Sequence, residues 1–435
     1  MNTKTKNTGA AWIISASMGY GHERTAHNLR HLAPDQAIIN ANDYPDIPES
    51  DAQKWTNDRR GYEAISRIKK IPLVGDAIFG SMDHLQKIDT FYPQRDQSAP
   101  NLILRHIYHR LYGGWNKALI QKLSNNPLPM ICTFFTPAFA AEVWKYPGDI
   151  YCIVTDSDMA RHWVPLEPIT SRIQYLAPTD RVAERLRLYG VQEKNIHLVG
   201  YPLPQDNIGG KSEKSLKRDL GSRLFNLDPE QAFLSKYQHT LRFHIGEQYL
   251  FNPPARPMTI LYSVGGAGAQ KEMGLQIAKS LEADIKAGKI QLVLSAGNRK
   301  EIAEYYHDNL KHMSFYSHLG RHIHILYHES KHEYFTLFNE WMRKVDILWT
   351  KPSELSFYAG LGIPILMAPS LGTQEDANRR WLKAIGAGIT PEDVQYTHLW
   401  LWDWLRAGYL AKAAFEGFLY APKMGVYEIE KMIQK

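Results

Sequence analysis

Two stretches of the chain share one pattern, in which a short apolar segment is followed by a glycine-rich turn and then by a helix. The first stretch has its apolar segment at residues 10–17 and its turn at residues 18–22. The second has them at residues 258–264 and 265–268. Glycine permits the tight turn between a buried parallel strand and its crossover helix. The pattern therefore predicts two α/β units, each with a parallel sheet covered by helices on both faces.

Further short apolar segments alternate with helical stretches in both halves of the chain. They lie at residues 129–135, 150–155, 173–177 and 195–199, and again at residues 290–295, 322–327, 345–349 and 363–368. This alternation predicts a doubly wound parallel sheet in each half. A length of 435 residues fits two such domains.

The predicted domains are separated by a polar, irregular stretch. We expect an N-terminal Rossmann-like domain at residues 1–204, a connector at 205–257 and a C-terminal Rossmann-like domain at 258–400. Residues 401–435 are expected to form helices that return to the N-terminal domain. Doubly wound sheets bind ligands at the carboxyl ends of their strands, so two facing units predict an interdomain cleft.

Composition excludes several classes of protein. No apolar run approaches the roughly 20 residues of a membrane-spanning helix, and no secretory signal is visible. The two cysteines, Cys132 and Cys152, cannot supply a disulfide framework or a metal cluster. We therefore expect a cytoplasmic protein in a reducing compartment.

The residues between Asp96 and Glu142 include no acidic side chain. Within this stretch, residues 102–122 combine aromatic and aliphatic side chains with four cations, Arg105, Arg110, Lys117 and Lys122. A helix lying on an anionic membrane surface needs this composition. A core helix that exposes a basic face shows the same periodicity, so periodicity alone leaves both interpretations open.

The second glycine turn fits a phosphate-binding site. Gly265, Gly266, Ala267 and Gly268 allow backbone N–H groups to approach an anion at the start of a helix. The acidic residue of a dinucleotide site, expected near residues 295–298, is absent there, which disfavours a nicotinamide enzyme. The alternative interpretation is that these glycines only form a tight turn between a strand and a helix and bind no ligand.

Several motifs, taken in order, resemble one family. They are residues 17–26 with Gly19, Gly21 and His22; residues 154–158 with His162 and Trp163; residues 200–202; residues 265–268; residues 351–353; residues 362–364; and residues 372–375 with Asn378. Together they resemble the GT-B glycosyltransferases that make glycolipids. This group includes plant monogalactosyldiacylglycerol synthases, bacterial processive diacylglycerol glucosyltransferases and the peptidoglycan lipid-intermediate N-acetylglucosaminyltransferase.

The resemblance implies an inverting transfer of a hexosyl group from a UDP-sugar to a lipid-linked acceptor such as diacylglycerol, at the cytoplasmic face of a membrane. The base that takes the acceptor proton is His22 or Asp156, and Asp156 could instead orient His22. Acceptor contacts are implied for Gly19, Gly21, His162 and Trp163. No cofactor is implied beyond the donor. No metal is expected either, because the pair Asp156 and Asp158 lies in the first unit, away from the donor.

The resemblance also implies a set of donor contacts. Gly265, Gly266, Ala267 and Gly268 would hold the diphosphate, Tyr327 would lie near the base, Glu354 would bind the ribose, and Gln374 with Glu375 would bind the sugar hydroxyls. Ser353 and Asn378 are implied as further donor contacts. Phe357 occupies the position where the family has its ribose-binding glutamate, and Glu354 lies one helical turn earlier. Two alternatives stay open: a UDP-sugar epimerase of the same architecture, and a catalytically inactive nucleotide-sugar-binding homologue.

Overall fold

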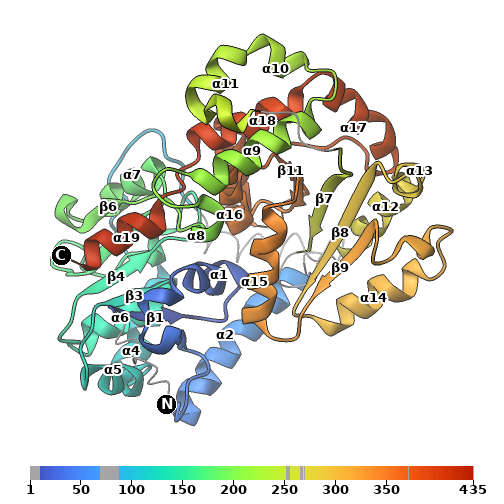
Figure 1. Ribbon diagram of the computed structural model, residues 1–435. Coiled ribbons are helices and arrows are strands. Elements are labelled where there is room, and N and C mark those ends of the chain that lie inside the picture. The colour runs from blue at the N-terminus through green and yellow to red at the C-terminus, as the bar shows by residue number, and fades with distance from the viewer. Residues whose placement is uncertain are drawn as a thin grey trace, which may run out of the picture. The chain divides into compact units, whose positions relative to one another are not determined.

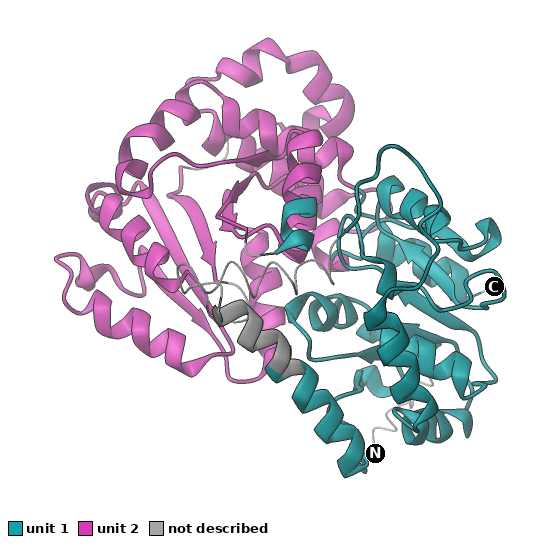
Figure 2. Cartoon of the chain, turned by 180° about the vertical axis from the view of Figure 1, so that it is seen from behind, with its two compact units in different colours: residues 1–203, 371–378, 422–435 teal, residues 204–370, 379–421 magenta. Residues whose placement is uncertain are grey.

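The computed structural model describes residues 10–68, 88–250, 255–264, 268, 270–370 and 372–434. The chain forms two compact units, coloured separately in Figure 2. Unit 1 comprises residues 1–203, 371–378 and 422–435, and unit 2 comprises residues 204–370 and 379–421. Each unit holds one six-stranded sheet in which all neighbouring strands are parallel. The predicted α/β class with two doubly wound units is confirmed.

Unit 1 has the strand order β2-β1-β3-β4-β5-β6. Its strands are β1 (Trp12–Ser15), β2 (Ile39–Asn40), β3 (Met130–Cys132), β4 (Ile150–Ile153), β5 (Gln174–Ala177) and β6 (Ile196–Leu198). Its helices are α1 (Tyr20–Asn28), η1 (Arg30–Leu32), η2 (Pro34–Gln36), α2 (Glu49–Ile68), α4 (Leu102–Tyr112), α5 (Lys117–Ser124), α6 (Phe135–Val143), η3 (Arg161–Trp163), α7 (Asp180–Leu188), η4 (Glu193–Asn195) and α19 (Gly425–Ile433).

The sheet of unit 1 is buried on both faces. Successive side chains of a strand point to opposite faces, so Ile13 and Ile14 join two different hydrophobic clusters. Val426 and Ile429 of α19 pack in the cluster of Ile13, which places the C-terminal helix on that face. Burial of each such side chain stabilises the fold by roughly 1.5–3 kcal/mol.

Unit 2 has the strand order β12-β11-β10-β7-β8-β9. Its strands are β7 (Met258–Ser263), β8 (Ile290–Gly297), β9 (Ile323–Tyr327), β10 (Ile347–Thr350), β11 (Ile365–Met367) and β12 (Gly388–Ile389). Its helices are α8 (Gln205–Ile208), α9 (Lys214–Leu227), α10 (Ala232–Lys236), α11 (Gln238–Ile245), η5 (Glu247–Tyr249), α12 (Lys271–Ser280), α13 (Glu282–Lys286), α14 (Lys300–Leu310), η6 (Tyr316–His318), α15 (Lys331–Met342), η7 (Glu354–Leu361), η8 (Val394–Tyr396), α17 (Thr397–Arg406) and α18 (Tyr409–Tyr420). Helix α16 (Thr373–Ala384) is divided between the two units. Its residues up to Asn378 belong to unit 1, and the rest belong to unit 2.

Helices flank the sheet of unit 2, and α14 packs on β8 and β9 (Figure 1). Among the helices within the described ranges, none combines the length and the apolar character needed to cross a membrane.

Both sheets reverse their strand order at one point. In unit 1 this switch lies between β1 and β3, and in unit 2 it lies between β7 and β10. At the second switch Ser263 is the register partner of Thr350, so the loops after β7 and β10 leave the sheet side by side. Open α/β sheets bind ligands at such switch points, outside the carboxyl ends of the strands. Each unit therefore has one favoured edge for a site.

Candidate active site

The loop after β1 is fixed by a glycine and by polar contacts. Gly19 has φ 140° and ψ 157°, a conformation that only glycine adopts readily, and it caps α1, which contains Gly21. The backbone N–H of Ser17 donates to Asn42 (2.6 Å), and the Ser17 hydroxyl donates to Glu23 (2.7 Å). These contacts hold the first turn of α1, which carries His22, at the switch point of unit 1.

The imidazole of His22 has a defined tautomer. Its Nδ1 lies 2.7 Å from the backbone carbonyl oxygen of Thr133, which directly follows β3. A carbonyl can only accept, so Nδ1 carries the hydrogen and Nε2 of the neutral ring keeps its lone pair. The hydroxyl of Thr155, after β4, lies 3.3 Å from the same Nδ1. The geometry therefore leaves Nε2 as the ring nitrogen that can accept a proton.

Aromatic rings surround His22. The ring of Phe134 meets the imidazole edge-on at a centroid distance of 4.9 Å, and the ring of Trp163 lies at 5.8 Å. Burial lowers the pKa of His22 to about 4, so the ring is neutral at pH 7. Sequence reasoning missed Phe134 as a site residue. Phe134 lies inside the predicted apolar segment 129–135, and the structure places it two residues after the end of β3, at the carboxyl edge of the sheet.

The second candidate base, Asp156, is held by Asn378. The carboxamide of Asn378 donates to Asp156 Oδ1 (2.9 Å) and accepts from the backbone N–H of Ser157 (2.8 Å). Asp158 forms a bidentate ion pair with Arg185 at 2.8 and 2.9 Å. The two aspartates therefore have different partners. Within the described ranges, no group of three or more His, Cys, Asp or Glu side chains is arranged to hold a metal ion.

His162 and Trp163 are both buried in η3, and both rings lie near that of Phe135, at 5.4 and 5.0 Å. Trp163 also lies near the imidazole of His22. Burial, and then the neighbouring Arg161, lowers the pKa of His162 to about 4. Its Nδ1 is buried and has no hydrogen-bond partner among the residues that the structure describes. The structure thus brings Trp163 to His22 and directs His162 elsewhere.

The predicted phosphate turn is described only in part. Gly265, Gly266 and Ala267 lie outside the described residues. Gly268 has φ 68°, and a Cβ atom there would lie 2.9 Å from Cδ1 of Ile302, so both backbone conformation and space favour glycine. Tyr262 donates through its hydroxyl to the carbonyl of Gln270 (2.6 Å), which fixes the chain just before α12.

Other predicted donor residues also lie at the carboxyl edge of unit 2. Ser353 and Glu354 follow β10, beside the turn that follows β7. Glu354 begins η7, a 3₁₀-helix with three residues per turn, so Glu354 and Phe357 lie on one side of it. Phe357 is fully buried, with its ring 5.0 Å from that of Trp381, whereas Glu354 is partly exposed.

Tyr327 is the last residue of β9 and is partly exposed. Gln374 and Glu375 are partly exposed in the first turn of α16, while Asn378 is fully buried. These three residues of α16 group with unit 1. Of the predicted donor-binding residues that the structure describes, unit 2 therefore contains four: Gly268, Tyr327, Ser353 and Glu354.

Comparisons with known proteins agree with the predicted resemblance. Residues 252–406 match a family described as a domain of unknown function, DUF6938. A processive diacylglycerol beta-glucosyltransferase from Staphylococcus epidermidis is 25% identical over 389 residues, which cover 86% of this chain and 79% of that protein. The parallel-sheet units and this sequence similarity confirm that the chain resembles the GT-B glycosyltransferases.

Solved structures show low sequence identity to the chain. A Staphylococcus aureus MnaA–UDP co-structure has a TM-score of 0.49 and 12% identity, covering 98% of this chain and 95% of that one. Acinetobacter baumannii MurG has a TM-score of 0.47 and 11% identity, covering 98% of this chain and 99% of that one.

Proposed function

We propose that the protein is an inverting glycosyltransferase that moves a hexosyl group from a UDP-sugar to a lipid-linked acceptor such as diacylglycerol. The observation that carries this proposal is the His22–Thr133 contact, which leaves a proton-accepting Nε2 at the switch point of unit 1. Similarity to a processive diacylglycerol beta-glucosyltransferase over most of the chain supports the donor and the acceptor.

In this mechanism His22 Nε2 takes the proton of the acceptor hydroxyl. The acceptor oxygen then attacks the anomeric carbon, and the bond from that carbon to the diphosphate breaks, so that UDP leaves with the electron pair. The Thr133 carbonyl keeps Nδ1 protonated throughout and stabilises the positive charge that develops on the ring. Asp156 is the alternative base, but its Oδ1 already accepts a hydrogen bond from the Asn378 amide, whose oxygen is in turn held by the backbone N–H of Ser157.

On the donor side, backbone N–H groups of the turn at 265–268 and the positive end of α12 would bind the diphosphate. Phe357 occupies the position of the family's ribose-binding glutamate. Because Glu354 lies on the same side of η7 as Phe357, its carboxylate would replace that glutamate. Gln374 and Glu375 would bind the sugar hydroxyls, and Tyr327 would lie near the base.

A lipid acceptor requires the protein to reach a membrane, and we place the contact on α4 in unit 1. Leu104, Ile107 and Leu111 are buried, so α4 is a core helix with an outer face. Leu102 and Tyr112 on that outer face are 72% and 65% exposed. Exposed apolar side chains beside cations suit an anionic lipid surface.

The four cations of residues 102–122 differ in their surroundings. Arg105 and Lys117 are exposed. Arg110 forms an ion pair with Asp58 at 2.7 Å and lies over the ring of Trp115. Lys122 donates to the carbonyl of Pro45 at 3.0 Å. Lys117 lies 4.8 Å over the ring of Trp144. Arg105 is therefore the cation best placed to meet lipid headgroups.

The decisive test is mass spectrometry of lipid extracts incubated with the purified protein and a panel of UDP-sugars. We expect a glycosylated lipid whose formation requires both substrates. Isomerised UDP-sugar formed without an acceptor would establish the epimerase instead. UDP binding without turnover on any acceptor would establish an inactive homologue.

A further inference from the structure

Unit 2 has a pocket at the edge of its sheet opposite to the predicted donor site. The pocket has a volume of about 370 Å³. Pro257 directly precedes β7, Gln291 is the second residue of β8, and Lys344 lies shortly before β10. All three lining residues therefore stand at the amino ends of the strands. The glycine turn and Glu354 follow the carboxyl ends, so the two places are separated by the length of the strands.

Four of the nine residues that line the pocket are basic, and one is acidic. Its cations are Arg218, Arg256, Arg343 and Lys344, and its acid is Asp219. Behind the lining, the fully buried carboxylate of Asp346 forms a bidentate contact with Arg256 at 2.6 and 2.7 Å. Four cations thus face two carboxylates, which leaves two positive charges uncompensated in the pocket.

Several N–H groups at the pocket are available to a ligand. Arg343 donates hydrogen bonds to Asp219 from Nε and from Nη2. Its other terminal nitrogen, Nη1, has no hydrogen-bond partner among the described residues. Arg218 reaches Asp219 through Nε alone and is about half exposed. Lys344 lies 5.8 Å over the ring of Trp341 and has no ion pair among the described residues. A guanidinium carries five N–H donors, so both arginines keep donors that point away from Asp219.

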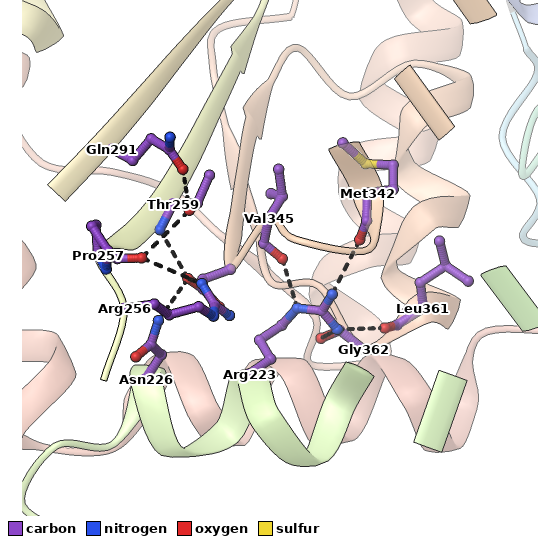
Figure 3. A network of polar contacts seen from close by, with 11 residues as sticks. Arg223, Asn226, Arg256, Pro257, Thr259, Gln291, Met342, Val345, Leu361 and Gly362 are labelled. Carbon is purple, nitrogen blue, oxygen red and sulfur yellow. Dashed lines mark hydrogen bonds and ion pairs between the residues drawn. The ribbon is translucent and has the colours of Figure 1, made fainter. Parts of the chain in front are cut away.

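A polar network lies beside the pocket and includes one of its cations, Arg256 (Figure 3). Asp346 also accepts from the side chain of Asn226 (3.0 Å) and from the backbone N–H of Thr259 (2.8 Å). Arg223, fully buried in α9, donates to the carbonyl of Val345 at 2.8 Å. The start of β10 and the linker at Arg256 are therefore fixed before any ligand arrives, which lowers the entropic cost of binding.

From this arrangement we propose that the pocket binds the phosphate group of an anionic ligand. A phosphate monoester carries a charge near −2 at pH 7 and three acceptor oxygens, which matches two uncompensated positive charges. Arginine forks recognise phosphate oxygens in pairs, and Lys344 adds a point charge. The hydroxyl of Ser222 also lines the pocket. The ligand is a free phosphorylated compound or a phospholipid headgroup, and the proposal does not depend on the proposed transferase activity.

Isothermal titration of the full-length protein with inorganic phosphate tests this site. Saturating UDP is added in a second titration, so that binding at a donor site is blocked. We expect phosphate binding that persists with UDP and becomes about tenfold weaker or more in the double variant Arg218→Gln, Lys344→Gln, since two charge-assisted contacts are lost. Both residues are substantially exposed, so the variant should fold normally. Lys300→Gln, 75% exposed on α14, is the matched control and should bind like the wild type.

Flotation with vesicles that contain phosphatidic acid, a lipid whose headgroup is a phosphate monoester, distinguishes the two sources of phosphate. If the double variant floats less than the Lys300→Gln control, the ligand is a lipid headgroup. If both float equally while phosphate titration shows the expected loss, the ligand is a free phosphorylated compound. Absence of phosphate binding, binding abolished by UDP, or equal affinity in the wild type and the double variant would overturn the proposal.

Discussion

The Nδ1 atom of His22 lies 2.7 Å from the backbone carbonyl oxygen of Thr133. This hydrogen bond joins the first turn of α1 to the residue that follows β3, across the switch point of the unit 1 sheet. Because the carbonyl is fixed by the strand, it sets both the orientation and the tautomer of the imidazole. Nε2 is therefore the ring nitrogen that keeps its lone pair.

Replacement of His22, the proposed base, should abolish most of the turnover and leave the affinity for the donor unchanged. His22→Ala should lower kcat by about 10² to 10⁴, the usual contribution of a general base. UDP affinity, measured by calorimetry, should stay at the wild-type value, since the proposed diphosphate site is in unit 2. His312→Ala, at an exposed position of unit 2, serves as the control. Near-normal turnover of His22→Ala would move the base to Asp156.

The pH profile should differ from that of an ordinary histidine base. Burial lowers the pKa of His22 to about 4, so the ring loses its proton well below neutrality. The acidic limb of kcat/KM should therefore lie near pH 4, and the rate should show no fall around pH 6.5. Initial rates measured between pH 3.5 and 8 cover both the expected limb and the region around pH 6.5. A limb near 6.5 would contradict the role of burial.

His162 should make the protein sensitive to acid. Its pKa is about 4 in the folded state, against an ordinary value of 6.5, and burial is the main cause. Between these values the unfolded chain binds more protons, so the free energy of unfolding falls as pH drops from 6.5 to 4, by up to about 3 kcal/mol. Urea unfolding of wild type and His162→Gln at several pH values should show a smaller pH dependence in the variant. His312→Gln should keep the wild-type slope.

Arg223 should be among the most sensitive positions of unit 2. Its guanidinium is fully buried and donates to the carbonyls of Met342, Val345, Leu361 and Gly362. Burial lowers its pKa to about 10, so it stays charged at neutral pH. Arg223→Met leaves these carbonyls without a donor and should cost about 3 kcal/mol or more of unfolding free energy. Arg242→Met, 42% exposed on α11, should change stability by less than about 0.5 kcal/mol.

The sheets were predictable because buried strands leave a strong local signal. The apolar segments at 10–17, 258–264 and 150–155 contain β1, β7 and β4, and the segment at 290–295 covers all but the last two residues of β8. Strands β2 and β12 were missed, since each has only two residues and leaves no periodicity to detect. Strand order was not predicted either, because pairing depends on contacts far apart in the sequence.

The sequence predicted only which residues of the candidate site lie at the carboxyl edges of the two sheets. His22 was selected from its place after a strand, and the structure adds Thr133 and Phe134, whose roles depend on a backbone carbonyl and a ring orientation. Side-chain partners were also hidden: Asn378, predicted as a donor contact from the resemblance, binds Asp156 and Ser157 within unit 1. The sequence distance between these residues gives no hint of that contact.

Membrane docking through α4 should depend on some of its cations and not on others. Arg105 is exposed, whereas Arg110 is held by Asp58 and stacked on Trp115. A cation near anionic headgroups contributes about 1 kcal/mol, so Arg105→Gln should weaken vesicle binding about fivefold. Arg110→Gln should have little effect on vesicle binding, although it removes an ion pair that stabilises the fold.

Flotation with anionic and neutral vesicles at low and high salt measures this difference. Binding of the wild type should fall at high salt, because exposed charges are screened. Leu102→Ser combined with Tyr112→Ser removes two exposed apolar side chains and should weaken binding at both salt concentrations, since apolar burial is not screened. If Arg105→Gln and Arg110→Gln bind alike, or if the wild type stays unbound at low salt, then α4 is only a core helix with a basic face and the acceptor must be reached by another surface.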